Sequence, residues 1–252
     1  MRILLSGATG KMGHMITDLL KDSAQHEIVA GFAAEIDPDL PYPVYLDLSD
    51  VEQIDQIEVI IDFSNPASLD ALLEFGIEHN IPLVIASTGY TDQQEAAISK
   101  AAEEIAIMHA KNMSLGVNVM QIMVQQLAAM LKNFDIEIIE KHHRYKVDSP
   151  SGTAKMLFEA ANQGRENSLT ELDGRAGIYE GRSANEVGVS AIRGGTIVGE
   201  HSVIFAGEDE IIEIKHQANS RKIFAAGAIQ AAEFIIRQPA GFYDMDDVLK
   251  KR

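Results

Sequence analysis

The strongest constraint on the fold is a regular alternation of short apolar runs with helical patterns in the first half of the chain. The apolar runs cover residues 2–6, 27–32, 59–63, 83–87 and 105–109. Helical patterns lie between them, at about 11–21, 66–79 and 92–103, and Pro66 suits a first helical turn with Ser64 or Asn65 as its cap. Such alternation predicts parallel strands joined by right-handed helical crossovers, hence an α/β fold with a doubly wound parallel sheet over roughly residues 1–112.

A glycine-rich loop stands between the first apolar run and the first helix. It reads Gly7-Ala8-Thr9-Gly10-Lys11-Met12-Gly13, with the spacing G-x-x-G-x-x-G. A Rossmann-type fold needs glycines at this point for a tight turn, for close approach to a pyrophosphate and for helix–strand packing. Glu35 follows the second apolar run, where an acid accepts hydrogen bonds from ribose hydroxyls. The loop therefore predicts dinucleotide binding; the alternative is a glycine-rich turn that binds nothing.

The pattern changes in the second half of the chain. Strand-like runs cover residues 134–143, 187–193, 198–206 and 210–216, and helices are expected at 152–163 and 221–237. A polar segment at 165–185 contains several glycines and is expected to be a long mobile loop. Closely spaced strands are typical of antiparallel pairing. We therefore expect a smaller α+β domain with a mixed, mostly antiparallel sheet.

Composition excludes several classes of function. The net charge is −17, so nucleic acid and anionic membranes are not expected as partners. The chain has no cysteine, which excludes disulfides, zinc–thiolate sites and cysteine nucleophiles. The first apolar run is too short for a signal peptide, and the longest uncharged stretch, 112–131, is too polar to span a membrane. These features predict a cytoplasmic protein with a buried helix at 112–131.

One short segment reverses the acidic character of the chain. Lys141-His142-His143-Arg144-Tyr145-Lys146 has five basic residues in six, and it follows a predicted strand. Ser149 or Ser151 could cap the next helix, whose first amides, around Gly152 and Thr153, would then face a carboxylate. Adjacent histidines on a strand point to opposite sides, so His142 and His143 are expected to differ in role. The alternatives are a solvated charged edge or, less in keeping with the spacing, a metal site; we expect no metal.

Residues 140–154, Glu-Lys-His-His-Arg-Tyr-Lys-Val-Asp-Ser-Pro-Ser-Gly-Thr-Ala, closely resemble the signature of the 4-hydroxy-tetrahydrodipicolinate (dihydrodipicolinate) reductase family of lysine biosynthesis. The resemblance runs nearly end to end. It includes the glycine loop, Thr88-Gly89-Tyr90, residues 112–118, Arg193-Gly194-Gly195 with Gly199-Glu200-His201, and residues 241–245.

The resemblance implies both architecture and activity. Members of this family have a Rossmann domain, here 1–113 and 220–252, and a central substrate-binding domain, here 114–219, that forms a homotetramer. They reduce a small cyclic, unsaturated imine dicarboxylate with NADH or NADPH, giving tetrahydrodipicolinate for lysine and diaminopimelate synthesis.

The resemblance also assigns residues. His142 and Lys146 are expected to be catalytic, and Lys146 is expected to donate the proton that accompanies hydride transfer. His143, Gly152 and Thr153 are expected to hold the substrate carboxylates. The residues expected to line the cofactor are Gly7, Ala8, Thr9, Gly10, Lys11, Met12, Glu35, Ala86, Ser87, Thr88, Ala110, Lys111, Asn112 and Met113.

Three departures from the family pattern concern the surroundings of the cofactor. Ser87 stands where a second threonine is usual. Lys111 and Met113 replace a small and an aromatic residue. Ile36 stands where members that grip a 2′-phosphate often carry arginine.

Other functions fit the residues less well. Semialdehyde dehydrogenases with a similar loop need a cysteine, and short-chain dehydrogenases need Tyr followed four residues later by Lys, which none of the six tyrosines has. A dinucleotide-sensing regulatory protein without turnover would explain the glycine loop but leaves His142, His143 and Lys146 without a role.

Overall fold

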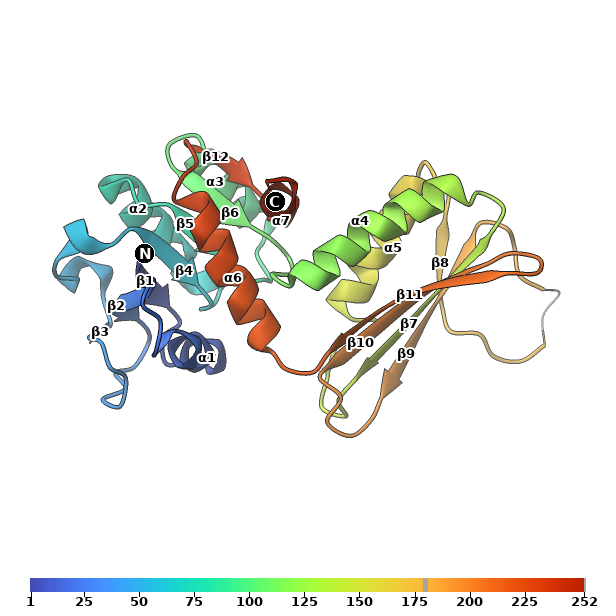
Figure 1. Cartoon of the computed structure of the whole chain (residues 1–252), viewed down its shortest axis with the longest axis horizontal. Helices are drawn as coiled ribbons and strands as arrows, with labels where there is room; N and C mark the ends of the chain where they lie inside the picture. The colour runs from blue at the N-terminus through green and yellow to red at the C-terminus, as the bar shows by residue number, and fades with distance from the viewer. Residues whose placement is uncertain (179–180, 252) are drawn as a thin grey trace. The chain divides into compact units, whose positions relative to one another are not determined.

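The computed structural model describes residues 1–178 and 181–251 and divides into two compact units (Figure 1). One unit is Met1–Leu115 with Lys222–Arg252, and the other is Gly116–Arg221. The divisions fall at 115/116 and 221/222, compared with the expected domain boundaries at 113/114 and 219/220.

The first unit is built on a seven-stranded sheet in which every neighbouring pair is parallel. Its order is β12-β6-β5-β4-β1-β2-β3, so six of its strands follow the 3-2-1-4-5-6 order of Rossmann folds. The strands are β1 Arg2–Ser6, β2 Glu27–Phe32, β3 Val44–Tyr45, β4 Val59–Asp62, β5 Leu83–Ile85, β6 Ala106–His109 and β12 Gly241–Tyr243. The predicted doubly wound parallel sheet is confirmed.

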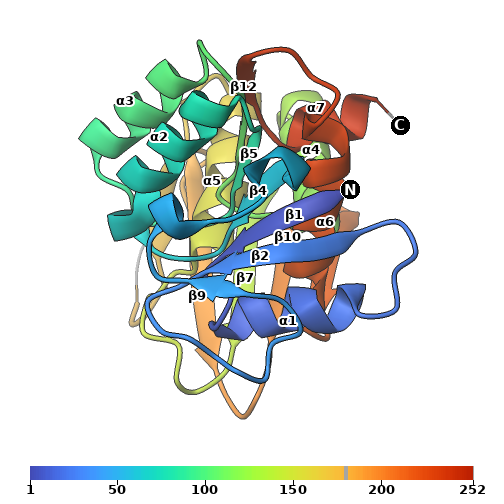
Figure 2. The same ribbon diagram turned by 90° about the vertical axis from the view of Figure 1, so that its left-hand side faces the viewer.

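Helices cover both faces of this sheet. The helices are α1 Lys11–Leu20, α2 Leu69–His79, α3 Asp92–Ala101, α6 Lys222–Ile235 and α7 Met245–Lys250. Alternation along β1 sends Leu4 into a core with α2 and α3, and Ile3 and Leu5 into a second core with α1 and α6. Figure 2 shows these two helix pairs on opposite sides of the sheet. Asn65 caps the 3₁₀ turn Pro66–Ser68 that precedes α2, which is one of the two caps expected there.

The second unit is a five-stranded sheet with two helices on one face (Figure 1). Its elements are α4 Leu115–Met130, which begins at the end of the first unit, β7 Asp135–His142, α5 Gly152–Gly164, β8 Thr170–Asp173, β9 Glu186–Arg193, β10 Gly199–Ala206 and β11 Ile211–Ala218. Ile136 and Ile138 of the central strand β7 pack in a core with Val124 of α4 and Leu157 of α5. The helix expected at 112–131 is thus α4.

The mixed character predicted for the second sheet is confirmed, but antiparallel pairs are not its majority. In the order β11-β10-β7-β9-β8, the first two pairings are antiparallel and the last two are parallel. The segment at 165–185 is also more than a loop, because it contains β8, which pairs with β9 just after it. Residues 179–180 of that segment lie outside the described residues. The connection that contains α5 brings β9 beside β7 in parallel, which strand spacing alone did not indicate.

No helix among the described residues is long and apolar enough to cross a bilayer.

Candidate active site

The glycine loop packs tightly against the backbone on two sides. Gly7 has φ +77°, and a Cβ there would lie 2.6 Å from the carbonyl oxygen of Phe63, which follows β4. A Cβ on Gly13 would lie 2.2 Å from the carbonyl oxygen of Ala8. Both positions therefore require glycine, and the loop forms a narrow turn at the carboxyl end of β1.

The amino end of α1 is open for an anion. Its N-cap is Gly10, which makes no side-chain capping bond, and its first turn contains no acidic residue. Free backbone amides and the helix dipole favour a phosphate at such an end. The loop also lies between β1 and β4, where the strand order reverses and doubly wound folds bind their ligands. These residues fit a dinucleotide pyrophosphate.

The other predicted cofactor residues follow the carboxyl ends of neighbouring strands in the same sheet. Glu35 is exposed after β2. Ala86, Ser87 and Thr88 follow β5, and Ala110, Lys111, Asn112 and Met113 follow β6. Because the carboxyl ends of parallel strands meet at one edge, the sheet gathers all of them along the edge that holds the glycine loop.

A buried carboxylate at this edge was not predicted. Asp62, at the end of β4, is 1% exposed and accepts hydrogen bonds from the hydroxyls of Ser64, at 2.5 Å, and Ser87, at 2.7 Å. It ties the loop after β4 to the loop after β5. Burial, with the negative charge of Asp62 as a smaller cause, raises the pKa of the Tyr90 phenol. The sequence feature that could have predicted this role for Asp62 is an acid at the end of an otherwise apolar strand.

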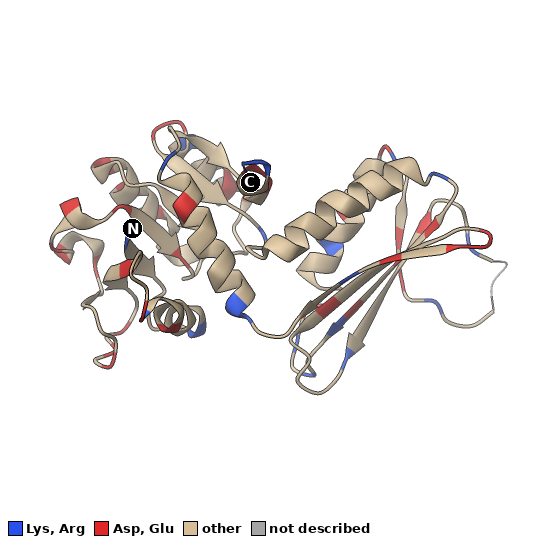
Figure 3. Ribbon diagram, in the orientation of Figure 1, with Lys and Arg blue, Asp and Glu red and all other residues tan. Residues whose placement is uncertain are grey.

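In the second unit, the basic segment begins inside β7 and ends in the following loop. His142 is the last residue of β7, and its Nδ1 lies 2.7 Å from Oε2 of Glu140. Glu140 is fully buried and makes a two-pronged ion pair with Arg193 of β9. Figure 3 shows acidic and basic segments close together on the strands of this sheet, which such ion pairs explain.

The loop after β7 holds the other two basic residues singled out from the sequence. Lys146 donates to Oδ1 of Asp148 at 2.8 Å and is mostly buried. His143 lies beyond the strand end, and its Nδ1 is buried without a hydrogen-bond partner among the described residues. The basic side chains of His142, His143 and Lys146 thus lie at or just after the carboxyl end of β7. The buried Nδ1 of His143 can donate or accept a hydrogen bond there.

The amino end of α5 follows the basic segment and is capped by a serine. Ser151 is its N-cap, one of the two serines expected in this role, and its hydroxyl accepts from the amide of Ala154 at 3.1 Å. The first turn has no acidic residue, and nothing lies within 4 Å of a Cβ built on Gly152. The amides around Gly152 and Thr153 can therefore meet a carboxylate.

The histidines around this end favour the neutral state. Burial lowers the pKa of His142, Glu140 raises it, and the charges of Lys146 and Arg193 lower it further, with a net lowering. Burial, aided by the charge of His142, lowers the pKa of His201 to about 4. His201 is stacked edge-on against His142 and bonds through Nε2 to the hydroxyl of Ser151 at 2.9 Å.

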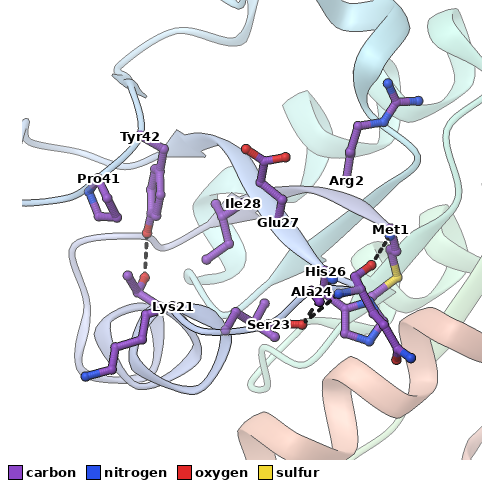
Figure 4. A pocket seen from close by; sticks show the side chains of 13 residues that line it. Met1, Arg2, Lys21, Ser23, Ala24, His26, Glu27, Ile28, Pro41 and Tyr42 are labelled. Carbon is purple, nitrogen blue, oxygen red and sulfur yellow. Dashed lines mark hydrogen bonds between the residues drawn. The ribbon is translucent and has the colours of Figure 1, made fainter.

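A separate hollow of about 420 Å³ lies at the other edge of the first unit's sheet (Figure 4). Arg2, Glu27 and Ile28, at the amino ends of β1 and β2, line it together with Lys21 and Tyr42. Doubly wound folds bind ligands at the carboxyl ends of their strands, so this hollow is not the cofactor site. Among the described residues, no three His, Asp or Glu side chains are grouped to hold a metal ion.

Known proteins resemble the chain over its whole length. The family model described as dihydrodipicolinate reductase, N-terminus, matches residues 1–113, and that described as dihydrodipicolinate reductase, C-terminus, matches residues 116–249. A 4-hydroxy-tetrahydrodipicolinate reductase from Caldanaerobacter subterraneus subsp. tengcongensis is 44% identical over 250 residues, covering 99% of this chain and 98% of the relative. One from Clostridium tetani is 45% identical over 251 residues, covering 98% and 96%.

Solved structures share the fold. A dipicolinate-bound dihydrodipicolinate reductase from Paenisporosarcina sp. TG-14 has a TM-score of 0.81 at 22% identity, covering 96% of this chain and 97% of that one. An amine dehydrogenase from Mycobacterium smegmatis has a TM-score of 0.65 at 11% identity, covering 97% and 95%. The open glycine loop and the family match imply a nicotinamide dinucleotide as cofactor. The resemblance seen in the sequence is confirmed: the chain belongs to the dihydrodipicolinate reductase family.

Proposed function

We propose that this chain reduces 4-hydroxy-tetrahydrodipicolinate to tetrahydrodipicolinate with NADH or NADPH, as a cytoplasmic enzyme of lysine and diaminopimelate biosynthesis. Full-length similarity to reductases of that name supports the activity. The observation that carries the substrate assignment is the amino end of α5, which has no acidic residue in its first turn and follows the loop with His143 and Lys146, in a chain of net charge −17. This local reversal of charge suits a small dicarboxylate.

Each proposed site residue has a separate task. The amides of Gly152 and Thr153, with His143, hold the substrate carboxylates and orient the ring. Bound NADH or NADPH supplies the hydride. Hydride addition to a conjugated imine leaves electron density on nitrogen and the adjacent carbon, so a positioned acid lowers the barrier. Lys146 donates this proton from Nζ, and His142 donates or accepts a proton at Nε2.

A coupled assay tests this function. The substrate is made enzymatically, because it is a reactive imine precursor, and is added to the chain with NADH or NADPH. Loss of the reduced-nicotinamide absorbance that depends on both substrate and protein is expected. A protein that binds NADH tightly but oxidises none of it would support the regulatory alternative, which otherwise has no observation in its favour.

NADH is expected to be used at least as well as NADPH. Glu35 repels a 2′-phosphate, the neighbouring Ile36 is 63% exposed and carries no charge, and Asp37 adds an acid that is paired with His14 at 3.4 Å. Fluorescence titration of both cofactors checks this. A tenfold tighter binding of NADPH would contradict it, and Lys11→Ala would then test whether Lys11, exposed at the start of α1, holds the phosphate.

A homotetramer assembled through the second unit's sheet is also proposed. The face of this sheet opposite α4 and α5 carries Ile192 and Ile211, which are 45% and 69% exposed. Such apolar side chains on a broad sheet face favour association. Light scattering is expected to give 4 × 27.5 = 110 kDa.

Matched variants locate this interface. Ile192→Asp and Ile211→Asp are expected to lower the mass, whereas Leu46→Asp, at a leucine of the first unit whose 55% exposure lies between theirs, is not. A monomer mass for the parent protein at micromolar concentration would contradict the tetramer.

A further inference from the structure

Glu140 is a charged residue on the buried face of a strand. It follows Ile136 and Ile138 on the side of β7 that packs against the helices, and it is 0% exposed. A buried carboxylate is costly unless every oxygen is hydrogen bonded or paired with a cation. The sequence therefore retains an acid at a position that packing alone would fill with another apolar residue.

Both oxygens of Glu140 are fully engaged. Oε1 accepts from the amide of Ser151 at 3.0 Å and from Nη2 of Arg193 at 2.7 Å. Oε2 accepts from Nη1 of Arg193 at 2.7 Å and lies 2.7 Å from Nδ1 of His142. Burial alone would raise the pKa of Glu140, but the hydrogen bonds from Arg193 and His142 outweigh it and lower the pKa. Glu140 is therefore ionised and can only accept.

An ionised partner determines the tautomer of His142. Since Oε2 cannot donate, Nδ1 of the neutral imidazole must carry the proton, and Nε2 is left as the atom that exchanges protons. Gly199 of β10 lies close to the ring of His142, since a Cβ built on this glycine would be only 3.1 Å from Nε2.

The same ion pair also holds the loop that carries Lys146. Arg193 donates from Nη2 to the carbonyl oxygen of Asp148 at 2.8 Å, and the side chain of Asp148 accepts from Lys146. The bond from Ser151 to Glu140 sets the position of the α5 N-cap. One buried pair therefore contacts the strand end with His142, the loop with Lys146 and the helix end with Gly152.

We infer that Glu140, held by Arg193, is the positioning residue of this site: it keeps the proton of His142 on Nδ1 and holds the amino end of α5 in register with it. The inference rests on the proposed function of His142, but the tautomer itself does not. The charged groups that face His142 are Glu140 on its own strand, Arg193 on β9 and Lys146 in the loop, with His201 on β10.

Nitrogen-15 NMR of the histidine rings tests the tautomer in the unaltered protein. At a pH of about 8, where the ring is neutral, the His142 signal, assigned by its loss in His142→Gln, is expected to show a protonated Nδ1. A protonated Nε2 would overturn the inference. This measurement needs neither turnover nor a Glu140 variant that folds.

Kinetics of Glu140→Gln test the consequence for the reaction. Loss of the negative charge is expected to lower kcat by about tenfold or more, since the amide no longer fixes the tautomer, and to shift the His142 limb of the pH–kcat profile to lower pH. Glu137→Gln is the matched control, because Glu137 lies on the same strand, is paired in the same two-pronged way with Arg175, and faces the other side.

The NMR and kinetic measurements together distinguish a failure of this inference from a failure of the proposed function. An unchanged pH profile in Glu140→Gln, or an equal shift in Glu137→Gln, would overturn the positioning role. Full turnover in His142→Gln would instead overturn the proposed role of His142, while the tautomer measured by NMR would stand.

Discussion

Replacing Lys146 with alanine is expected to lower the turnover number by about 10²–10⁴-fold, the range typical of a lost general acid. His142→Gln is expected to fall in the same range. Neither residue belongs to the glycine loop or the strand ends of the first unit, so both variants are expected to bind NADH normally. Steady-state kinetics, with circular dichroism to confirm folding, measure this effect.

Two further variants separate chemistry from binding. His143→Ala is expected to raise the Michaelis constant and to recover part of its rate at high substrate, because it removes a carboxylate contact. Lys141→Ala is the matched control: Lys141 belongs to the same basic segment but is paired with Glu200 on the opposite face of β7. If Lys146→Ala, His142→Gln and His143→Ala all stayed within a few-fold of the parent, as the control is expected to, the segment would be a solvated charged edge.

Acidification is expected to destabilise the folded chain through His201. Burial holds its pKa at about 4, compared with 6.5 for an unburied histidine. Between these values the unfolded chain binds a proton that the folded chain refuses, so stability is full above about pH 6.5 and is lost as the pH falls toward 4. The expected loss from this residue alone is about 2 kcal/mol between about pH 7 and pH 5.

Urea unfolding of the parent and of His201→Gln at several pH values isolates this contribution. The glutamine can still hydrogen bond to Ser151 but does not titrate, so its free energy of unfolding should fall less on acidification. His142 and His216, whose pKa values are also lowered, add to the loss in both proteins. Parallel curves for parent and variant would contradict the prediction.

The first unit could be predicted well because its strands are buried on both faces. Runs such as Leu4-Leu5 and Ile60-Ile61 are continuous in the sequence, and the helices between them fix parallel pairing. The short elements β3, β12 and α7 were missed. Gly241–Tyr243 has no apolar run of its own and becomes a strand only by pairing with β6.

The second unit could be predicted only in part. Burial alternates along β7 and β11, and β11 is exposed at every second position, so these segments are detectable as strands. The sequence does not show which strands pair with each other, because the parallel pair of β7 and β9 joins residues about fifty positions apart. The strand β8 lies in a polar segment whose extended form depends on β9.

Some of the proposed site residues could be predicted from the sequence and others could not. His142, Lys146 and Ser151 belong to one contiguous segment, so the sequence alone was enough to propose them. Glu140 could have been noticed as the one acid in the buried register of Ile136 and Ile138. Arg193 and His201 could not be assigned to it, because only the strand pairing brings them beside β7.

Transfer of deuterium from labelled cofactor tests the central claim most directly. The chain is incubated with enzymatically made substrate and NADH carrying deuterium at both C4 positions, and the dicarboxylate product is examined by mass spectrometry. Reduction by the proposed route predicts tetrahydrodipicolinate that carries one deuterium, formed in proportion to the NADH oxidised. Oxidation of the cofactor without deuterium in the dicarboxylate, or no dicarboxylate product at all, would contradict it.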